Sequence, residues 1–317
     1  MKISFIIRCH NEEEHIGRLL SGIMQQTPEA SEIILVDSGS TDATLSIASR
    51  FPIRILHIAP DEFSFGRSLN LGCAAAGGDC LVLASAHVYP VYRDWLAKLT
   101  SPFENEKIAL VYGKQRGDRN TRYSEHKVFA RWFPEQSDPN QQHTFCNNAN
   151  AAIRRSVWEA LPYDESLTGL EDIEWAKRAK QAGYDLAYVA DAEVIHVHNE
   201  TPRMIYNRYR REAIAMKTIY PEQRFTLFDF GRFFTSNAVS DSYHALHDRM
   251  LWKNLRSIFL FRMMQFWGTY RGYTQHGPVT KRLKETFYYA DGWTRPQTGQ
   301  DPTDSRGRID YSELDEG

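Results

Sequence analysis

The fold is decided by the stretch Glu32-Ile-Ile-Leu-Val-Asp-Ser-Gly-Ser-Thr-Asp-Ala-Thr44. Its apolar half, residues 33–36, has the length and composition of a buried strand. Its polar half is rich in Asp, Ser and Gly, which form turns, and predicts a helix capped near Ser40. A buried strand that passes through a polar turn into a helix is the repeating unit of an α/β fold.

The same alternation continues on both sides of this stretch. Apolar runs at 3–7, 53–58 and 80–84 predict three more short strands. Between them, apolar residues at helical spacing predict a helix that Asn11 caps and a second helix over 68–76. Strands separated by helices predict an α/β fold with a mostly parallel, Rossmann-like sheet and helices on both faces.

After Pro90 the pattern is less regular. Strands are predicted at 109–112, 145–153, 187–189 and 193–198, and helices at 125–132 and 171–182. From 204 to 289 helical periodicity dominates, and 294–317 is polar, as expected of a loose tail. The chain is therefore divided into a domain at 1–200, a helical segment at 201–293 and a tail at 294–317.

Composition excludes several classes of protein. With 42% hydrophobic and 25% charged residues among 317, the chain is not a disordered one, and its net charge of −2 gives no nucleic-acid signal. The four cysteines form no CxxC pair, which fits reduced thiols and a cytoplasmic location. No signal peptide is recognisable, and no uncharged apolar stretch reaches the roughly 18–20 residues of a membrane-spanning helix.

Polar segments follow the predicted strands, where an open α/β sheet binds its ligand. They read Arg8-Cys-His-Asn-Glu12, 36–42 and Ser85-Ala-His87. None contains a Walker loop or a GxGxxG fingerprint, which argues against a P-loop ATPase or a dinucleotide enzyme.

Five motifs in this order resemble the family 2 inverting glycosyltransferases with the A-type nucleotide-sugar fold. They are Ile6-Ile-Arg-Cys-His-Asn-Glu-Glu13, the 32–44 stretch, Asn70-Leu-Gly72, Gly78-Asp79 and Glu171-Asp172. The similarity is greatest to the rhamnosyltransferase-like branch that builds bacterial surface polysaccharide. It covers roughly 1–200 and implies that this domain binds a nucleotide sugar. The implied reaction moves the sugar to a hydroxyl of a saccharide or lipid-linked saccharide, with UDP or dTDP donors favoured by analogy.

The resemblance implies nucleotide-binding roles for five residues. His10, Glu12 and Asp37 are expected to meet the base and ribose, and Arg67 to face the diphosphate, which a guanidinium grips in a fork. Ser85 can offer a hydroxyl to ribose or phosphate. For Asp37 the alternative is that it only caps its turn.

The resemblance also implies the catalytic base and the sugar contacts. Asp172 is expected to deprotonate the acceptor hydroxyl, with Glu171 orienting or contacting the acceptor, although carboxylates at a helix start also serve as ordinary caps. Asn148 and Asn150 are expected to reach sugar hydroxyls. Their alternative is backbone hydrogen bonding in a bend.

The metal motif departs from the family pattern. Where the family has Asp-x-Asp, this chain reads Ser85-Ala86-His87, so His87 becomes the candidate ligand for Mn²⁺ or Mg²⁺. His196 is the second candidate, and it shares a strand face with His198 because strand side chains repeat every two residues. The alternatives are structural histidines, with basic side chains such as Arg67 and those of 208–211 neutralising the diphosphate.

The segment 201–293 carries 15 Lys and Arg against 7 Asp and Glu, and 20 of the 40 aromatic residues. One interpretation is a helix in an anionic membrane surface at the inner face of the cytoplasmic membrane. The aromatic residues that would then point into the membrane are Trp252, Phe259, Phe266 and Trp267. The basic residues that would meet lipid phosphates are Lys253, Arg256 and Arg262. The other interpretation is that these helices cover the catalytic domain or a homodimer partner.

Two alternative functions remain at this point. A nucleotidyltransferase that makes sugar nucleotides could share the sheet, but it would normally carry a Gly-rich signature after the first strand. A non-catalytic sugar-nucleotide-binding or scaffold protein is favoured by the lost Asp of the metal motif and opposed by the intact Glu171-Asp172 pair.

Overall fold

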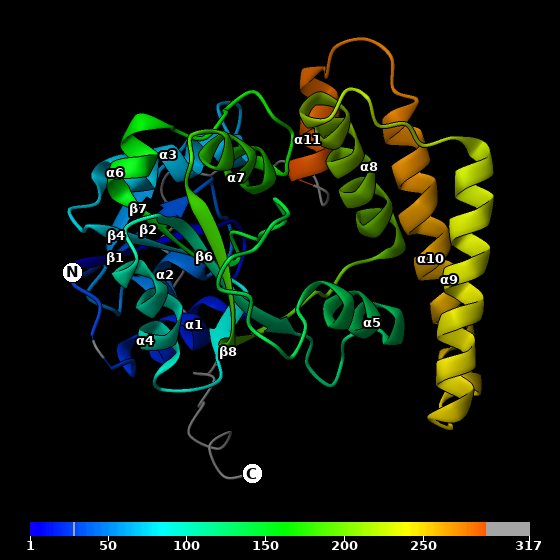
Figure 1. The fold of residues 1–317 in the computed structure, drawn as a ribbon, viewed down its shortest axis with the longest axis horizontal. Helices are drawn as coiled ribbons and strands as arrows, with labels where there is room; N and C mark the ends of the chain where they lie inside the picture. Colours follow the sequence, from blue (N-terminus) through cyan, green and yellow to red (C-terminus); the bar gives the residue numbers. More distant parts are fainter. Residues whose placement is uncertain (28, 290–317) are drawn as a thin grey trace.

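The computed structural model describes residues 1–27 and 29–289; the tail predicted at 294–317 lies outside them. Its centre is an eight-stranded sheet with the order β3-β2-β1-β4-β7-β6-β8-β5 (Figure 1). In chain order the strands are β1 (Ile3–Cys9), β2 (Glu32–Asp37), β3 (Arg54–His57), β4 (Cys80–Ser85), β5 (Val88–Pro90), β6 (Ile108–Arg116), β7 (Asn150–Arg154) and β8 (Asp185–His196).

The first half of the sheet is parallel, as predicted. β1 lies in the middle and pairs in parallel with β2 and β4, and β2 pairs in parallel with β3. The second half is mixed: β7 runs antiparallel to both β4 and β6, whereas β6 and β8 are parallel. The antiparallel β7 therefore joins two parallel groups, and the polar ends of β1, β2 and β4 share one edge of the sheet.

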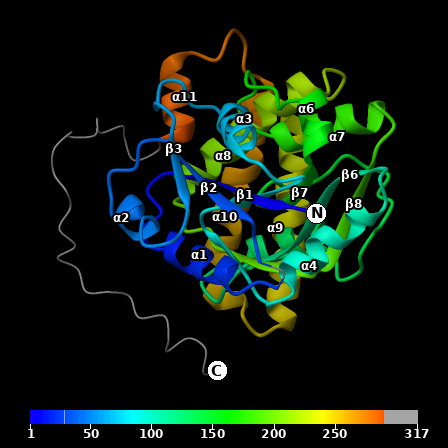
Figure 2. The same cartoon turned by 90° about the vertical axis from the view of Figure 1, so that its left-hand side faces the viewer.

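Helices cover both faces of the sheet, as Figure 2 shows. Alternate residues of each strand point to opposite faces, so Phe5 packs on one face and Ile6 on the other. The side of Phe5 is covered by α1 (Ile16–Met24), α2 (Thr44–Ala48) and α4 (Trp95–Thr100). The side of Ile6 is covered by α3 (Phe65–Ala75), α5 (Tyr123–Trp132), α6 (Arg155–Ala160) and α7 (Glu171–Gln181).

Several predicted boundaries are wrong. Asn11 does not cap α1, which begins at Ile16; Asn11 has φ 53° and its Oδ1 accepts a hydrogen bond from the backbone N–H of Thr41, which ties two loops together. The helix after β2 begins at Thr44 rather than near Ser40. The strands predicted at 187–189 and 193–198 are one strand, β8, and the strand predicted at 145–153 begins only at Asn150.

The C-terminal segment is helical, as predicted. It comprises α8 (Pro202–Ile219), α9 (Leu227–His247), α10 (Leu251–Tyr273) and α11 (Lys281–Tyr288). α8 and α11 lie on the side toward the sheet, and α9 and α10 form a hairpin on the far side of α8 (Figure 1). α10 approaches α8 closely at two glycines, where an added Cβ would lie 2.5 Å from a backbone oxygen: Gly268 and Gly272.

A buried ion pair holds the hairpin together. Nε of Arg262 on α10 lies 2.7 Å from Oδ2 of Asp241 on α9, and both side chains are buried. Nη2 of Arg262 also donates to the backbone oxygen of Ser124 on α5. Among the described helices, none is long and apolar enough to cross a membrane.

Candidate active site

A cavity of about 840 Å³ opens at the polar ends of β1 and β4. Eight of the predicted site residues line it: His10, Glu12, Ser85, His87, Asn148, Glu171, Asp172 and His196. Asp37, Arg67 and Asn150 do not line it. The fold therefore brings the predicted catalytic pair and the predicted metal ligands into one space, although they lie up to 109 positions apart in the sequence.

The carboxylate pair occupies the first turn of α7. Its preceding residue, Leu170, has φ 55°, a left-handed conformation that non-glycine residues adopt at a cost. Glu171 accepts a hydrogen bond from Nη1 of Arg8 at 3.1 Å. Asp172 accepts from the backbone N–H of Ile173 at 2.8 Å and of Asn148 at 3.3 Å. The two carboxylates are thus held by different donors.

Asp172 is set up to exchange a proton near neutral pH. Asp172 is only 8% exposed to solvent. Burial first, and then the negative charge of Glu171, raise the pKa of Asp172 to about 7, against the smaller opposing effect of its two backbone donors. A carboxylate with such a pKa, facing a cavity, is suited to act as a general base.

Two cations line the cavity beside Phe65: Arg8, to which the sequence analysis gave no role, and Arg211, which belongs to the cluster 208–211 expected to neutralise the diphosphate. Arg8 and Arg211 place their guanidinium carbons 4.8 Å and 4.6 Å from the ring centre of Phe65, so both groups stack on the same ring. Arg8 begins the polar segment that follows the first predicted strand, and Arg211 lies in the basic cluster 208–211. These two positions in the sequence are what could have indicated that both residues reach the site. Both line the cavity, where they add positive charge beside Glu171.

Arg67 and Asp37 lie apart from this charge. The Arg67 guanidinium is 45% exposed and lies 3.4 Å from a carboxylate oxygen of Glu62. Asp37 is buried and accepts hydrogen bonds from the backbone N–H groups of Gly39 and Ser40, which is the turn-capping alternative stated above. Beside it, Tyr289 donates from its hydroxyl to the backbone oxygen of Ser38.

The two asparagines have different surroundings. Asn148 lies beside the catalytic pair, with Nδ2 3.5 Å from Oε1 of Glu171. Asn150 is fully buried; its Oδ1 accepts from Nε1 of Trp95, and its Nδ2 donates to the backbone oxygens of Lys114 and Ala192. The side chain of Asn150 thus joins neighbouring strands and α4, which leaves Asn148 as the candidate for a sugar contact.

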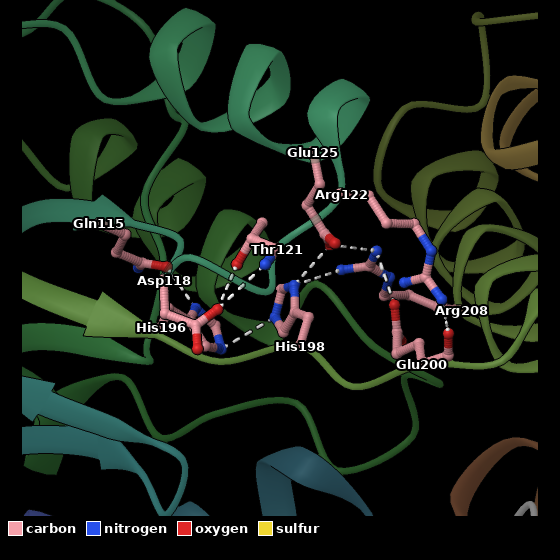
Figure 3. A network of polar contacts seen from close by, with 9 residues as sticks. All are labelled: Gln115, Asp118, Thr121, Arg122, Glu125, His196, His198, Glu200 and Arg208. Carbon is pink, nitrogen blue, oxygen red and sulfur yellow. Dashed lines mark hydrogen bonds and ion pairs between the residues drawn. The ribbon is translucent and has the colours of Figure 1, made fainter. Parts of the chain in front are cut away.

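The histidines gather at the other side of the cavity. The rings of His196 and His198 have centres 4.1 Å apart, and the ring of His87 lies 5.0 Å from that of His196. One ring nitrogen of each of the three lies within 4.8 Å of the others. Figure 3 shows His196 and His198 with their neighbours. Burial lowers the pKa of His196 well below its usual range, so its ring is neutral and able to bind a metal ion.

These residues fit a divalent ion. His87 and His196 are the predicted ligands, and each ring is fixed by a hydrogen bond at Nδ1, to Glu12 at 2.7 Å and to Gln115 at 2.6 Å. Such partners orient the imidazole of a metal ligand and increase its basicity. Ser85 also lines the cavity, but a neutral hydroxyl does not replace a carboxylate.

Comparison with known proteins gives a consistent result. The profile described as Glycosyl transferase family 2 matches residues 4–161. O-antigen chain rhamnosyltransferase RfbN of Salmonella typhimurium is 33% identical over 222 residues, which cover 66% of this chain and 70% of the relative. O-antigen chain rhamnosyltransferase WbaN of Salmonella anatum is 34% identical over 197 residues, which cover 58% of this chain and 62% of that protein, less than two thirds of its length.

Solved structures share the fold at lower identity. The mannosyltransferase PcManGT of Pyrobaculum calidifontis, in complex with GDP-Man and Mn²⁺, has a TM-score of 0.55 at 17% identity, covering 91% of this chain and 87% of that one. Residues 1–349 of TarS from S. aureus, in complex with UDP-GlcNAc, have a TM-score of 0.51 at 15% identity, covering 86% and 92%. The predicted A-type fold is therefore confirmed. The family match and the two named relatives favour a glycosyltransferase over the nucleotidyltransferase and scaffold alternatives. The chain belongs to glycosyl transferase family 2 and is a glycosyltransferase of the rhamnosyltransferase-like branch.

Proposed function

We propose that the chain is an inverting enzyme of polysaccharide biosynthesis that moves a hexosyl or deoxyhexosyl group from a nucleoside-diphosphate sugar to a hydroxyl of a saccharide or lipid-linked saccharide. The names of its relatives support the pathway and the acceptor class. The observation that carries the proposal is Asp172, a buried carboxylate of raised pKa that faces a cavity rich in cations.

The reaction is a single displacement. A carboxylate oxygen of Asp172 takes the proton of the acceptor hydroxyl, whose oxygen attacks the anomeric carbon from the face opposite the nucleotide. The bond between that carbon and the diphosphate oxygen breaks, and its electron pair leaves with the nucleoside diphosphate. Glu171, held by Arg8, orients the acceptor and keeps a negative charge beside Asp172.

Positive charge in the cavity receives the leaving diphosphate. Arg8 and Arg211, which lie in the cavity, serve here in place of Arg67, which lies outside it. His87 and His196 would hold a divalent ion, which would supply further positive charge to the leaving diphosphate.

The nucleoside is assigned to the same edge of the sheet. His10, Glu12 and Ser85 line the cavity there, and the ring of His10 lies 4.8 Å from that of Tyr289, which supplies an aromatic surface next to a base. Asp37 would reach the ribose only by exchanging part of its turn contacts. UDP or dTDP donors remain the favoured choice, with Asn148 contacting the sugar.

The test compares two substitutions on the same turn of α7. Asp172→Asn should lower the rate of nucleoside diphosphate release by about 10²–10⁴-fold while sugar-nucleotide binding, followed by calorimetry, stays unchanged. Glu174→Gln is the matched control, because Glu174 pairs with Arg178 outside the cavity. A rate for Asp172→Asn close to that of the control would remove Asp172 from the mechanism.

An apolar face on the α9–α10 hairpin supports a location at the membrane surface. Trp252 is 85% exposed and Tyr243 66% exposed, and Phe259 on α10 is exposed as well. Lys253 and Arg256 are exposed on the same helix as Trp252. We propose a cytoplasmic enzyme that binds peripherally to an anionic inner membrane surface, where a lipid-linked acceptor resides.

The predicted set of lipid contacts needs correction. Arg262 is buried against Asp241 and cannot meet lipid phosphates. Phe266 is half-buried, stacked on Phe233 of α9. A homodimer through the same face is the second candidate, because exposed aromatic residues also fit a protein interface.

Flotation with anionic liposomes at low and high salt separates these two partners. Each basic residue near the surface is worth roughly 1 kcal/mol, so membrane binding should be lost at high salt and weakened by Trp252→Ser. A concentration-dependent mass of twice the monomer in light scattering, with no flotation at low salt, would instead establish the dimer.

A further inference from the structure

Three histidine rings in the cavity have their Nδ1 atoms occupied by acceptors. Nδ1 of His87 lies 2.7 Å from Oε1 of Glu12, and Nδ1 of His196 lies 2.6 Å from Oε1 of Gln115. Nδ1 of His198 lies 2.7 Å from Oε1 of Glu125 and 3.3 Å from Nη1 of Arg208, a group that can only donate, so the much shorter contact to the carboxylate decides the role of this nitrogen. Carboxylate and amide oxygens only accept hydrogen bonds, so each Nδ1 carries the proton. In its neutral form, each ring then has its lone pair at Nε2.

Two of these lone pairs face each other. Nε2 of His196 and Nε2 of His198 are 3.0 Å apart. A hydrogen bond between them would require a proton on one Nε2, and a neutral ring with that proton would turn a bare Nδ1 toward its acceptor oxygen. A cation shared by the two nitrogens removes the repulsion without disturbing either Nδ1 contact. For comparison, a tetrahedral Zn²⁺ with Zn–N distances of about 2.0–2.1 Å separates its nitrogens by about 3.3 Å.

We propose that His87, His196 and His198 form a three-imidazole site whose preferred ion is Zn²⁺ rather than Mg²⁺ or Mn²⁺. His198 supplies the third ligand that Ser85 cannot supply in place of a carboxylate. Imidazole nitrogen suits Zn²⁺, Ni²⁺ and Cu²⁺, whereas Mg²⁺ and Mn²⁺ prefer carboxylate, carbonyl and water oxygen. Three protein ligands leave an open position on a zinc ion. The use of that position for a diphosphate oxygen rests on the proposed function; the binding of the ion does not.

Glu125 is the positioning residue of this site. Its Oε1 accepts from Nδ1 of His198 and from Nη2 of Arg208, at 2.7 Å and 3.1 Å (Figure 3). Arg208 is in turn paired with Glu200 at 2.8 Å. Glu125 lies on α5 and Arg208 on α8, so the orientation of the His198 ring depends on the contact between these two helices. A carboxylate behind a metal-bound imidazole fixes both its tautomer and its direction.

A second group of ligands lies nearby but is less suitable. Glu125, His198 and Glu200 also bring one atom each within 4.8 Å of one another. Both carboxylates already pair with the guanidinium of Arg208, whose positive charge would repel an added cation. This distinguishes the two arrangements: Glu200→Gln should leave metal binding intact, whereas a site at the second group would be lost.

The test uses the full chain, freed of metal with a chelator and without sugar nucleotide. Co²⁺, which replaces Zn²⁺ and absorbs visible light, should bind at one equivalent with the strong absorption of a tetrahedral site. One equivalent of Zn²⁺ should abolish that absorption, and a large excess of Mg²⁺ or Mn²⁺ should not. Weak octahedral-type absorption, no binding, or displacement by Mn²⁺ as effective as that by Zn²⁺ would overturn the proposal.

Variants identify the ligands. His198→Gln can still donate to Glu125, so it should preserve the fold, checked by circular dichroism, while abolishing the tetrahedral spectrum. Glu125→Gln should weaken Co²⁺ binding by about 10–100-fold, as is typical when the partner of a ligand histidine is lost. His247→Ala is the control, because its ring is exposed on α9. An unchanged spectrum in His198→Gln would contradict the assignment, whereas nucleoside diphosphate release, measured separately, tests the proposed function.

Discussion

Replacing Asp172 by Asn should inactivate the enzyme and remove a loss of stability that the wild type undergoes as the pH rises. The pKa of Asp172 is raised from 3.8 to about 7, chiefly by burial. The folded chain therefore binds this proton more tightly than the unfolded chain, and Asp172 lowers the free energy of unfolding as the pH rises from about 4 to about 7. Asparagine cannot ionise, so the variant lacks this loss.

The magnitude follows from the two pKa values. At about 1.4 kcal/mol per pKa unit, ionisation of Asp172 costs the wild type about 3 kcal/mol more at pH 8 than at pH 5. Asparagine also turns an N–H group toward the backbone N–H of Asn148, but that cost is the same at both values of pH. Urea unfolding measures the free energy of unfolding of Asp172→Asn and of the wild type at both values of pH. Between pH 5 and pH 8 the difference between the two proteins should shift by about 3 kcal/mol in favour of the variant. The exposed Asp191→Asn serves as control. If the free energies of unfolding of Asp172→Asn and wild type differ by the same amount at pH 5 and pH 8, the pKa of Asp172 is not raised.

Three further outcomes are expected. Glu171→Gln should move the acid limb of the kcat/KM profile to lower pH, because it removes a negative charge that raises the pKa of Asp172; a limb that stays in place would contradict this coupling. Arg262→Met should lower the free energy of unfolding by about 3–5 kcal/mol, since it leaves Asp241 buried without its partner, and pairing it with Asp241→Leu should recover most of that loss in urea unfolding. Gly272→Ala should cost about 1–3 kcal/mol, because its Cβ would lie 2.5 Å from the backbone of α8; unchanged stability would mean that the two helices separate freely.

The part of the fold that hydrophobic periodicity controls could be predicted from the sequence. The run at 3–7 became β1, and the 32–44 stretch became β2, its turn and α2, because short-range alternation of buried strands and amphipathic helices specifies them. The antiparallel insertion of β7 between β4 and β6 could not be predicted, since pairing between distant strands leaves no mark on the local pattern. The error at Asn11 has the same origin: its side chain serves another loop rather than its own helix.

The site was predictable where a motif carried the chemistry. Asp172, His87 and His196 reach the same cavity, whereas the side chain of Asn150 lies in the interior although it stands only two positions from Asn148. A spacing of two places residues on one face only inside a strand, and β7 begins at Asn150. Arg211 belongs to the predicted basic cluster 208–211, whereas Arg8 could not be identified as a cation of the cavity, because the local sequence does not show which distant side chains the fold brings to it.

Residues from both sides of the predicted domain boundary near residue 200 line the candidate active site. Arg208 and Arg211 come from α8, and Tyr288 comes from α11, yet all three line the cavity at the polar ends of β1 and β4. α8 is fastened to α7 by Nζ of Lys177, which donates to the backbone oxygen of Ile219 at 2.6 Å. α10 in turn packs on α8 through Gly272. A force or a surface that moves the α9–α10 hairpin should therefore act on the helix that carries Arg208 and Arg211, so the helical segment belongs to the candidate active site.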